Sequence, residues 1–97
     1  MKLILLALFR FRRINYLNNM NKKVEIYSTP TCHFCHMAKD FFNDNQIKFV
    51  DYDLSTNVEK REEVVKRSGQ MGVPVIFIDE EMVIGFDEDR LRELLGL

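Results

Sequence analysis

The most constraining feature of the sequence is a short apolar segment in its last third. Residues Val75–Ile78 read VIFI, with Pro74 before them and Asp79 after them. A run of this length without a polar residue is typical of a strand that is buried on both faces. Proline is tolerated at the first position of such a strand. The segment therefore predicts an inner strand of a sheet with helices packed over it.

Two helices are predicted by apolar residues at helical spacing. The first places them at i, i+3, i+4, i+7 and i+8 and is expected to end near residues 43–45. The second begins after Asp87, which can act as its cap, and has leucines along one side. The apolar residues of the two helices are Phe34, Met37, Ala38, Phe41 and Phe42, and Leu91, Leu94 and Leu95.

A third helix is predicted between these two. Thr56 and Glu59 have the spacing of a capping box, and Gly69 follows Ser68, the expected last helical residue. Oppositely charged residues four positions apart are expected to pair on its outer face. These pairs are Glu62–Lys66 and Glu63–Arg67.

Three further strands complete the pattern. They are predicted at Val24–Ser28, Ile47–Leu54 and Met82–Ile84, the last reached through a turn at residues 79–81. The element order is then β-α-β-α-β-β-α. A strand–helix–strand unit followed by a hairpin predicts an α/β fold with a four-stranded mixed sheet and three flanking helices.

The charge is distributed unevenly along the chain. The 97 residues have a net charge of −1, but residues 1–19 contain four basic side chains and no acidic one, so that residues 20–97 carry −5. Nucleic-acid binding relies on Lys and Arg to neutralise phosphates, and the acidic body of this chain argues against it.

The first nineteen residues do not resemble the rest. Their apolar run, Leu3–Phe9, is far shorter than the ~20 residues that cross a bilayer. Arginines follow it where a signal peptide would have small residues and a cleavage site. We therefore interpret residues 1–19 as an N-terminal extension outside the fold and residues 20–97 as one domain. Neither export nor stable membrane insertion is expected.

The chemistry is concentrated in "TPTCHFCHMAKDFF", residues 29–42, which holds both cysteines of the chain. Two cysteines are too few for a disulfide scaffold. Three chemistries fit the motif: thiol–disulfide exchange, haem attachment, and metal binding by Cys32, His33, Cys35 and His36. Four ligands from five consecutive residues can hardly surround a tetrahedral ion, and nothing else in the chain supports haem attachment. Exchange is the favoured interpretation.

The position of the pair favours exchange further. Cys32 falls where a loop becomes a helix, so unpaired N–H groups and the helix dipole are expected to lower the pKa of its thiol below the ~8.5 of a free cysteine. Cys35, one turn further, is close enough for a disulfide. Cys32 can attack a substrate disulfide, and Cys35 can then resolve the mixed disulfide.

The motifs together resemble the glutaredoxin-like redoxins of the thioredoxin superfamily. The resemblance rests on Thr29-Pro30-x-Cys32-x-x-Cys35, on Val73-Pro74 before a buried strand and on Gly85-Phe86-Asp87 before a last helix, and it covers roughly residues 23–97. It implies a thioredoxin-like fold, Cys32 as nucleophile, Cys35 as resolving cysteine and a cis-proline at Pro74 beside them. It also implies that substrate contacts residues of the surrounding loops. These are Thr29, Phe34, Val73, Pro74, Gly85, Phe86 and Asp87.

Departures from the family pattern bear on the electron donor. Glutaredoxins that use glutathione commonly have Pro-Tyr where this chain has His33-Phe34, and lysine where it has Thr29. They also have threonine in place of Gly72 and a Gly-Gly pair in place of Ile84-Gly85. Gly85-Phe86 is similar to small redoxins that take electrons from thioredoxin reductase and often serve ribonucleotide reductase.

The sequence thus predicts a cytoplasmic, monomeric dithiol–disulfide oxidoreductase that acts on protein disulfides. Its electrons are expected from glutathione or from a thioredoxin reductase, and no bound cofactor or metal is expected. Two alternatives stay open: an iron–sulfur or metal carrier that uses the cysteine motif, and a docking domain of redoxin fold in which the cysteines are incidental.

Overall fold

A computed structural model of the chain describes residues 22–97. The interpretation of residues 1–19 as an extension lies outside these described residues. Four strands and three helices follow one another as β1 (Val24–Ser28), α2 (His33–Asp44), β2 (Val50–Asp53), α3 (Val58–Ser68), β3 (Val75–Ile78), β4 (Glu81–Ile84) and α4 (Glu88–Leu95). This is the element order predicted from the sequence, and the mixed four-stranded sheet is confirmed.

The strands lie side by side in the order β2-β1-β3-β4. β1 pairs with β2 in parallel, while β3 is antiparallel to both β1 and β4. β1 and β3 are therefore the inner strands, and every residue of both is buried. The prediction that Val75–Ile78 is a strand buried on both faces is confirmed.

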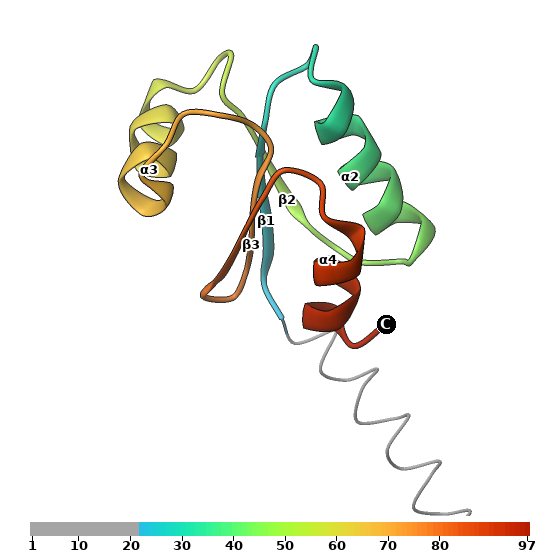
Figure 1. Cartoon of the computed structure of the whole chain (residues 1–97). Coiled ribbons are helices and arrows are strands. Elements are labelled where there is room, and N and C mark those ends of the chain that lie inside the picture. Colours follow the sequence, from blue (N-terminus) through green and yellow to red (C-terminus); the bar gives the residue numbers. More distant parts are fainter. Residues whose placement is uncertain (1–21) are drawn as a thin grey trace, which may run out of the picture.

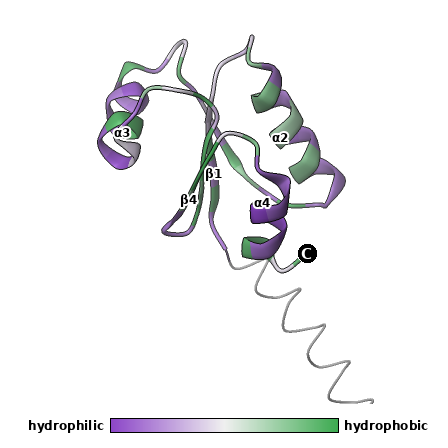
Figure 2. Ribbon diagram, in the orientation of Figure 1, coloured by the Kyte–Doolittle hydropathy of each residue, from purple (hydrophilic) through white to green (hydrophobic). Residues whose placement is uncertain are grey.

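The helices cover the two faces of the sheet unequally. Figure 1 shows α2 and α4 on one face and α3 on the other. Because side chains alternate along a strand, Val24 and Ile26 pack under α2 and α4, whereas Tyr27 packs under α3. In Figure 2 the hydrophobic colour accordingly concentrates on the strands, and hydrophilic residues gather at the β3–β4 turn and on the outer side of α3. Two apolar layers, one on each face, hold the domain together.

The second strand is shorter than predicted. Instead of Ile47–Leu54, β2 comprises Val50–Asp53. Gln46 has a φ of 58°, and the N–H of Ile47 donates to the carbonyl of Phe42 over 2.8 Å. Ile47 thus closes the end of α2 and buries its side chain in the core, so its apolar character reflects a helix terminus and not a strand.

The predicted start of the middle helix is also wrong. Asn57, not Thr56, caps α3, because its side-chain oxygen accepts the N–H of Lys60 over 3.1 Å. Thr56 instead uses its hydroxyl to donate to the carbonyl of Asp53. The end of the helix is as predicted, with Gly69 in the left-handed conformation directly after Ser68.

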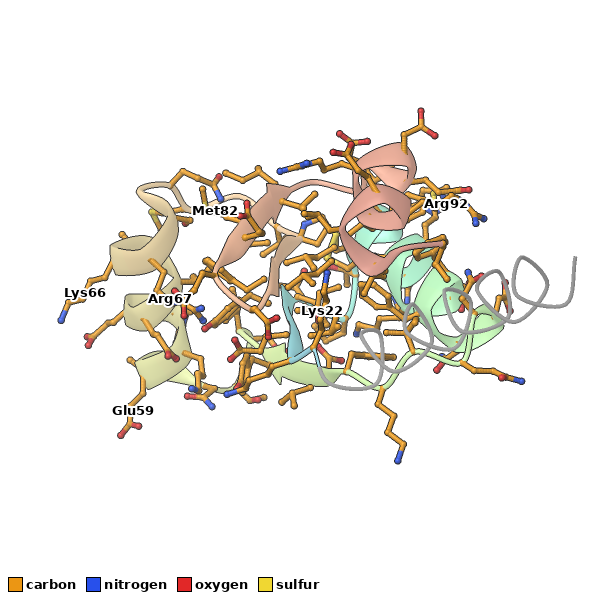
Figure 3. The ribbon with its side chains drawn as sticks, turned by 90° about the horizontal axis from the view of Figure 1, so that it is seen from below. Lys22, Glu59, Lys66, Arg67, Met82 and Arg92 are labelled. Carbon is orange, nitrogen blue, oxygen red and sulfur yellow. A yellow bond between two sulfur atoms is a disulfide. The ribbon has the colours of Figure 1, made fainter. Side chains whose placement is uncertain are left out.

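Arg67 does not lie on the outer face of α3 as predicted. Its guanidinium donates to the hydroxyl of Tyr27 over 2.8 Å and contacts Glu25 at 3.4 Å, and both partners lie on β1. Figure 3 shows Arg67 on the side of α3 that faces the sheet, while Glu59 and Lys66 point away from it. Glu63 pairs with Lys60 instead, at 2.6 Å. Arg67 therefore links α3 to the sheet and does not support an isolated helix.

No helix within residues 22–97 has the length and apolar character needed to cross a membrane.

Candidate active site

The topology brings three loops to one end of the sheet. Tyr27 near the end of β1 pairs with Val75 at the start of β3, and Val75 also pairs with Ile84 at the end of β4. The segments that continue from these positions therefore leave the sheet together. They are residues 29–32 before α2, residues 73–74 before β3 and residues 85–87 before α4.

Cys32 is the N-cap of helix α2, as predicted. Its backbone is extended, and its sulfur accepts a hydrogen bond from the N–H of Cys35 over 3.1 Å. The first turn of the helix has no acidic residue that would compensate the positive end of the dipole. A negative charge on the Cys32 sulfur would consequently be stabilised by the amide and by the dipole.

The two cysteines form a disulfide, and their Cα atoms lie 5.2 Å apart. Their exposure differs. Cys32 is half-buried at the surface, whereas Cys35 is completely buried under the first turn of α2. An incoming substrate can therefore reach Cys32 but not Cys35, which is the asymmetry that an attacking and a resolving cysteine require.

The loop before Cys32 is fixed by backbone and side-chain contacts. The carbonyl of Thr29 accepts the N–H of Cys32 over 3.3 Å. The carbonyl of Pro30 lies 2.7 Å from Nε2 of His36, so this nitrogen carries the donated proton. His36 therefore reaches back over the helix start to hold the loop, a contact that the sequence analysis did not anticipate. The ring of Phe34, also in the first turn, is 58% exposed.

The segment before β3 has the conformation that the resemblance implied. The Val73–Pro74 peptide bond is cis, and Pro74 is buried. Val73 is half-buried and packs against the apolar layer under α3. The Pro74 carbonyl accepts the N–H of Gly85 over 2.8 Å, which joins this segment to the loop before α4.

The residues of the loop before α4 have different structural roles: one packs into the core and another caps the helix. Gly85 has a φ of 81°, a conformation that favours glycine. The ring of Phe86 meets that of Phe41 edge-on at 6.0 Å, so its side chain supports the core in addition to any contact with substrate. Asp87 caps α4, because its Oδ1 accepts the N–H of Arg90 over 3.1 Å.

One polar cluster near the cysteine helix was missed. Asp51 on β2 contacts both Ser28 on β1 and Lys39 on α2. The available signal was that Lys39 follows Cys35 by four positions, which places both on one face of the helix. Its partner Asp51 is distant in sequence and could not be paired with it from spacing alone. Within residues 22–97, no three or more His, Cys, Asp or Glu side chains are grouped so as to hold a metal ion.

Comparisons with known proteins agree with this geometry. A glutaredoxin family model matches residues 24–83. The chain is 43% identical to glutaredoxin 3 of Escherichia coli over 65 residues, which is 67% of this chain and 78% of that protein. It is 39% identical over 72 residues to an uncharacterised glutaredoxin-like 8.6 kDa protein in the rubredoxin operon of Clostridium pasteurianum, covering 74% of this chain and 96% of that protein.

Solved structures show the same architecture. The structure superimposes on a mutant of a thioredoxin-like protein with a TM-score of 0.73 and 28% identity, covering 76% of this chain and 95% of the other. The fold and the cysteine pair define a thiol–disulfide oxidoreductase of thioredoxin-like fold. Within that class, the chain belongs to the glutaredoxin family.

Proposed function

We propose that this glutaredoxin-family chain reduces disulfides of protein substrates, with Cys32 as nucleophile and Cys35 as resolving cysteine. The observation that carries the proposal is the placement of Cys32 as the cap of α2, with the Cys35 amide directed at its sulfur over 3.1 Å. The difference in exposure between the two cysteines supports this order of action.

The proposed reaction balances in two exchanges. The Cys32 thiolate attacks one sulfur of the substrate disulfide, a mixed disulfide forms, and the departing substrate thiolate takes a proton from water. The Cys35 thiol then loses its proton and attacks the Cys32 sulfur, which releases the second substrate sulfur as a thiolate that takes up a proton in turn. The chain ends with the Cys32–Cys35 disulfide and the substrate with two thiols, so one electron pair has passed to the substrate.

Substrate is proposed to bind along the three loops that meet at this end of the sheet. The backbone of Val73, next to Pro74, would pair with an extended substrate segment, as in strand addition. Proline has no N–H that would compete for the thiolate at Cys32. Side chains around this segment would supply further contacts. These are Thr29, Phe34, Gly85, Phe86 and Asp87.

The electron donor is proposed to be a reductase of the thioredoxin reductase type in preference to glutathione. Membership of the glutaredoxin family is consistent with glutathione as donor. However, the three loops that meet at this end of the sheet, residues 29–32, 73–74 and 85–87, contain no Lys or Arg that could pair with the glutathione carboxylates. The exposed Phe34 ring offers an apolar contact that suits a protein partner better. Turnover with glutathione plus glutathione reductase, compared with turnover with thioredoxin reductase, tests this choice, and the second is expected to be faster.

The reaction also suggests where and in what form the chain works. A dithiol that donates electrons needs a reducing compartment, so we place it in the cytoplasm, as a monomer that meets its substrate and its reductase in turn.

Two variants test the cysteine roles. Cys32→Ser should abolish disulfide reduction, because no nucleophile remains. Cys35→Ser should accumulate a mixed disulfide between Cys32 and substrate that is visible by mass spectrometry without reductant. Full turnover by Cys32→Ser would overturn the assignment. Trapping of substrate on Cys35 in the Cys32→Ser protein would reverse the two roles.

A further inference from the structure

A polar cluster lies between helix α2 and the sheet. Ser28, the last residue of β1, is 1% exposed, and its hydroxyl donates to Oδ1 of Asp51 over 2.6 Å. Nζ of Lys39 lies 2.6 Å from the other carboxylate oxygen of Asp51. Both oxygens are therefore engaged, one by a buried hydroxyl and one by an ammonium group. The cluster joins α2 to both β1 and β2.

The spacing along α2 relates the cluster to Cys35. Lys39 follows Cys35 by one helical turn, so their Cβ atoms are about 5–6 Å apart. Long side chains on a helix lean toward its N-terminus, which directs Lys39 toward the turn of Cys35. Ser28 shares the sheet face of Val24 and Ile26, under α2, and stands at the end of β1 where α2 begins.

We infer that the opposed charges of Lys39 and Asp51 set the reduction potential of the Cys32–Cys35 pair. Reduction to a Cys32 thiolate and a Cys35 thiol adds two electrons and one proton to the disulfide, and so leaves a negative charge where the disulfide had none. A nearby cation stabilises that reduced state, and a nearby carboxylate destabilises it. Both residues act on the reaction indirectly, because their charges change the relative stability of the oxidised and reduced sulfurs. They are positioning residues in this sense. The inference rests on the proposed dithiol reaction.

Other charged groups near the cluster have partners of their own. Asp53, also on β2, has a pKa below its ordinary value because of hydrogen bonds from the hydroxyl and backbone of Ser55, with a smaller contribution from Lys39. His36, on the helix turn between Cys35 and Lys39, is bound to the carbonyl of Pro30. Neither residue is replaced in the variants below, and Lys39→Met alters Asp53 only through the smaller contribution of Lys39. Asp51→Asn retains Lys39, so the two variants together report on Lys39 and Asp51.

The test is a redox equilibrium of the full chain with dithiothreitol, with the reduced fraction measured by alkylation and mass. Lys39→Met leaves the carboxylate unbalanced and should shift the equilibrium about fivefold toward the disulfide, or about 20 mV for a two-electron couple. Asp51→Asn leaves the ammonium unbalanced and should shift it by a similar factor toward the dithiol. The double variant should lie near the wild type. Lys39→Arg, which retains the charge, should also leave the potential unchanged.

A second ion pair of the chain provides a matched control. Lys60 and Glu63 also lie 2.6 Å apart but on α3, across the sheet from α2. Lys60→Met and Glu63→Gln should leave the potential unchanged. Shifts of the same sign in Lys39→Met and Asp51→Asn, or no shift in either, would overturn the inference and leave the pair as a structural link. Failure of wild-type Cys32 and Cys35 to exchange with dithiothreitol at all would overturn the proposed function instead.

Discussion

The backbone amide of Cys35 donates a hydrogen bond to the sulfur of Cys32 over 3.1 Å, so the side chain that caps helix α2 is the sulfur of a cysteine. Caps are usually oxygens of Ser, Thr, Asp or Asn, which accept the orphan amides of the first turn. Here the same amides face an atom that can ionise. In the proposed mechanism, helix capping and activation of the nucleophile are thus one interaction.

We therefore predict that the thiol of Cys32 in the reduced chain has a pKa below the ~8.5 of a free cysteine. The amide of Cys35 and the positive end of the dipole both favour the thiolate. The pKa follows from the ultraviolet absorbance of the thiolate, or from the rate of alkylation as a function of pH, with the Cys35→Ser variant isolating Cys32. The same chain unfolded in urea is the control and should titrate near the free value. Equal pKa values in the two states would remove the electrostatic basis of the mechanism.

A second prediction concerns Gly85, whose φ is 81° and whose amide donates to the Pro74 carbonyl. Gly85→Ala should lower the free energy of unfolding by about 1–2 kcal/mol, because a side chain disfavours this conformation. It should also reduce turnover, since the strained loop no longer holds the segment before β3. Urea denaturation and steady-state kinetics measure the two effects.

Gly69 is the matched control for this change. Its φ is 73°, and a Cβ at either glycine would meet no atom within 4 Å, so both substitutions test conformation alone. Gly69 ends α3, on the sheet face opposite to α2. Gly69→Ala should lose similar stability and retain turnover. An equal loss of turnover in both variants would indicate a general effect of destabilisation.

Elements with a strong local signal could be predicted from the sequence. Contacts between residues that are distant in the sequence could not. The apolar run of β3 and the helical spacing of α2 are local, and both elements were predicted correctly. The apolar stripe expected on α2 is buried only at Ala38, Phe41 and Phe42, because Phe34 and Met37 in its first turns are exposed. Arg67 was misplaced because its partners, Glu25 and Tyr27, lie about forty positions away on β1. The Asp51 cluster was missed for the same reason. Spacing along a helix indicates which residues share a face, but not which face the fold will cover.

The start of α3 provides a third prediction, because Thr56 and Asn57 are adjacent candidates for the cap. Asn57 accepts the Lys60 amide over 3.1 Å, whereas the Thr56 hydroxyl makes only a long contact of 3.4 Å with Asp53. Asn57→Ala should lower the free energy of unfolding by about 1 kcal/mol, and Thr56→Ala by much less. Denaturation midpoints of the two variants measure this difference. The reverse order would restore the capping box that the sequence suggested.

The last prediction is the loss of stability at alkaline pH. Burial raises the pKa of both Tyr27 and Tyr52 above 10.0; the hydrogen bond and the charge of Arg67 partly oppose the shift at Tyr27, and Glu25 adds to the shift at Tyr52. Below pH 10 both phenols are neutral in the folded and the unfolded chain, so their contribution is fully present. Above it the unfolded chain ionises first and releases protons, so the free energy of unfolding should fall with rising pH until the folded phenols titrate.

Urea denaturation of the oxidised chain between pH 8 and pH 11 measures this fall, because the disulfide removes the thiols from the titration. The Tyr52→Phe variant should show a shallower fall, since one of the two phenols no longer ionises. Tyr27→Phe should also be shallower, but from a lower starting stability, because the 2.8 Å hydrogen bond from Arg67 is lost. A slope unchanged in both variants would mean that other groups cause the alkaline transition. The polar contacts between α3 and β1 would then have no part in it.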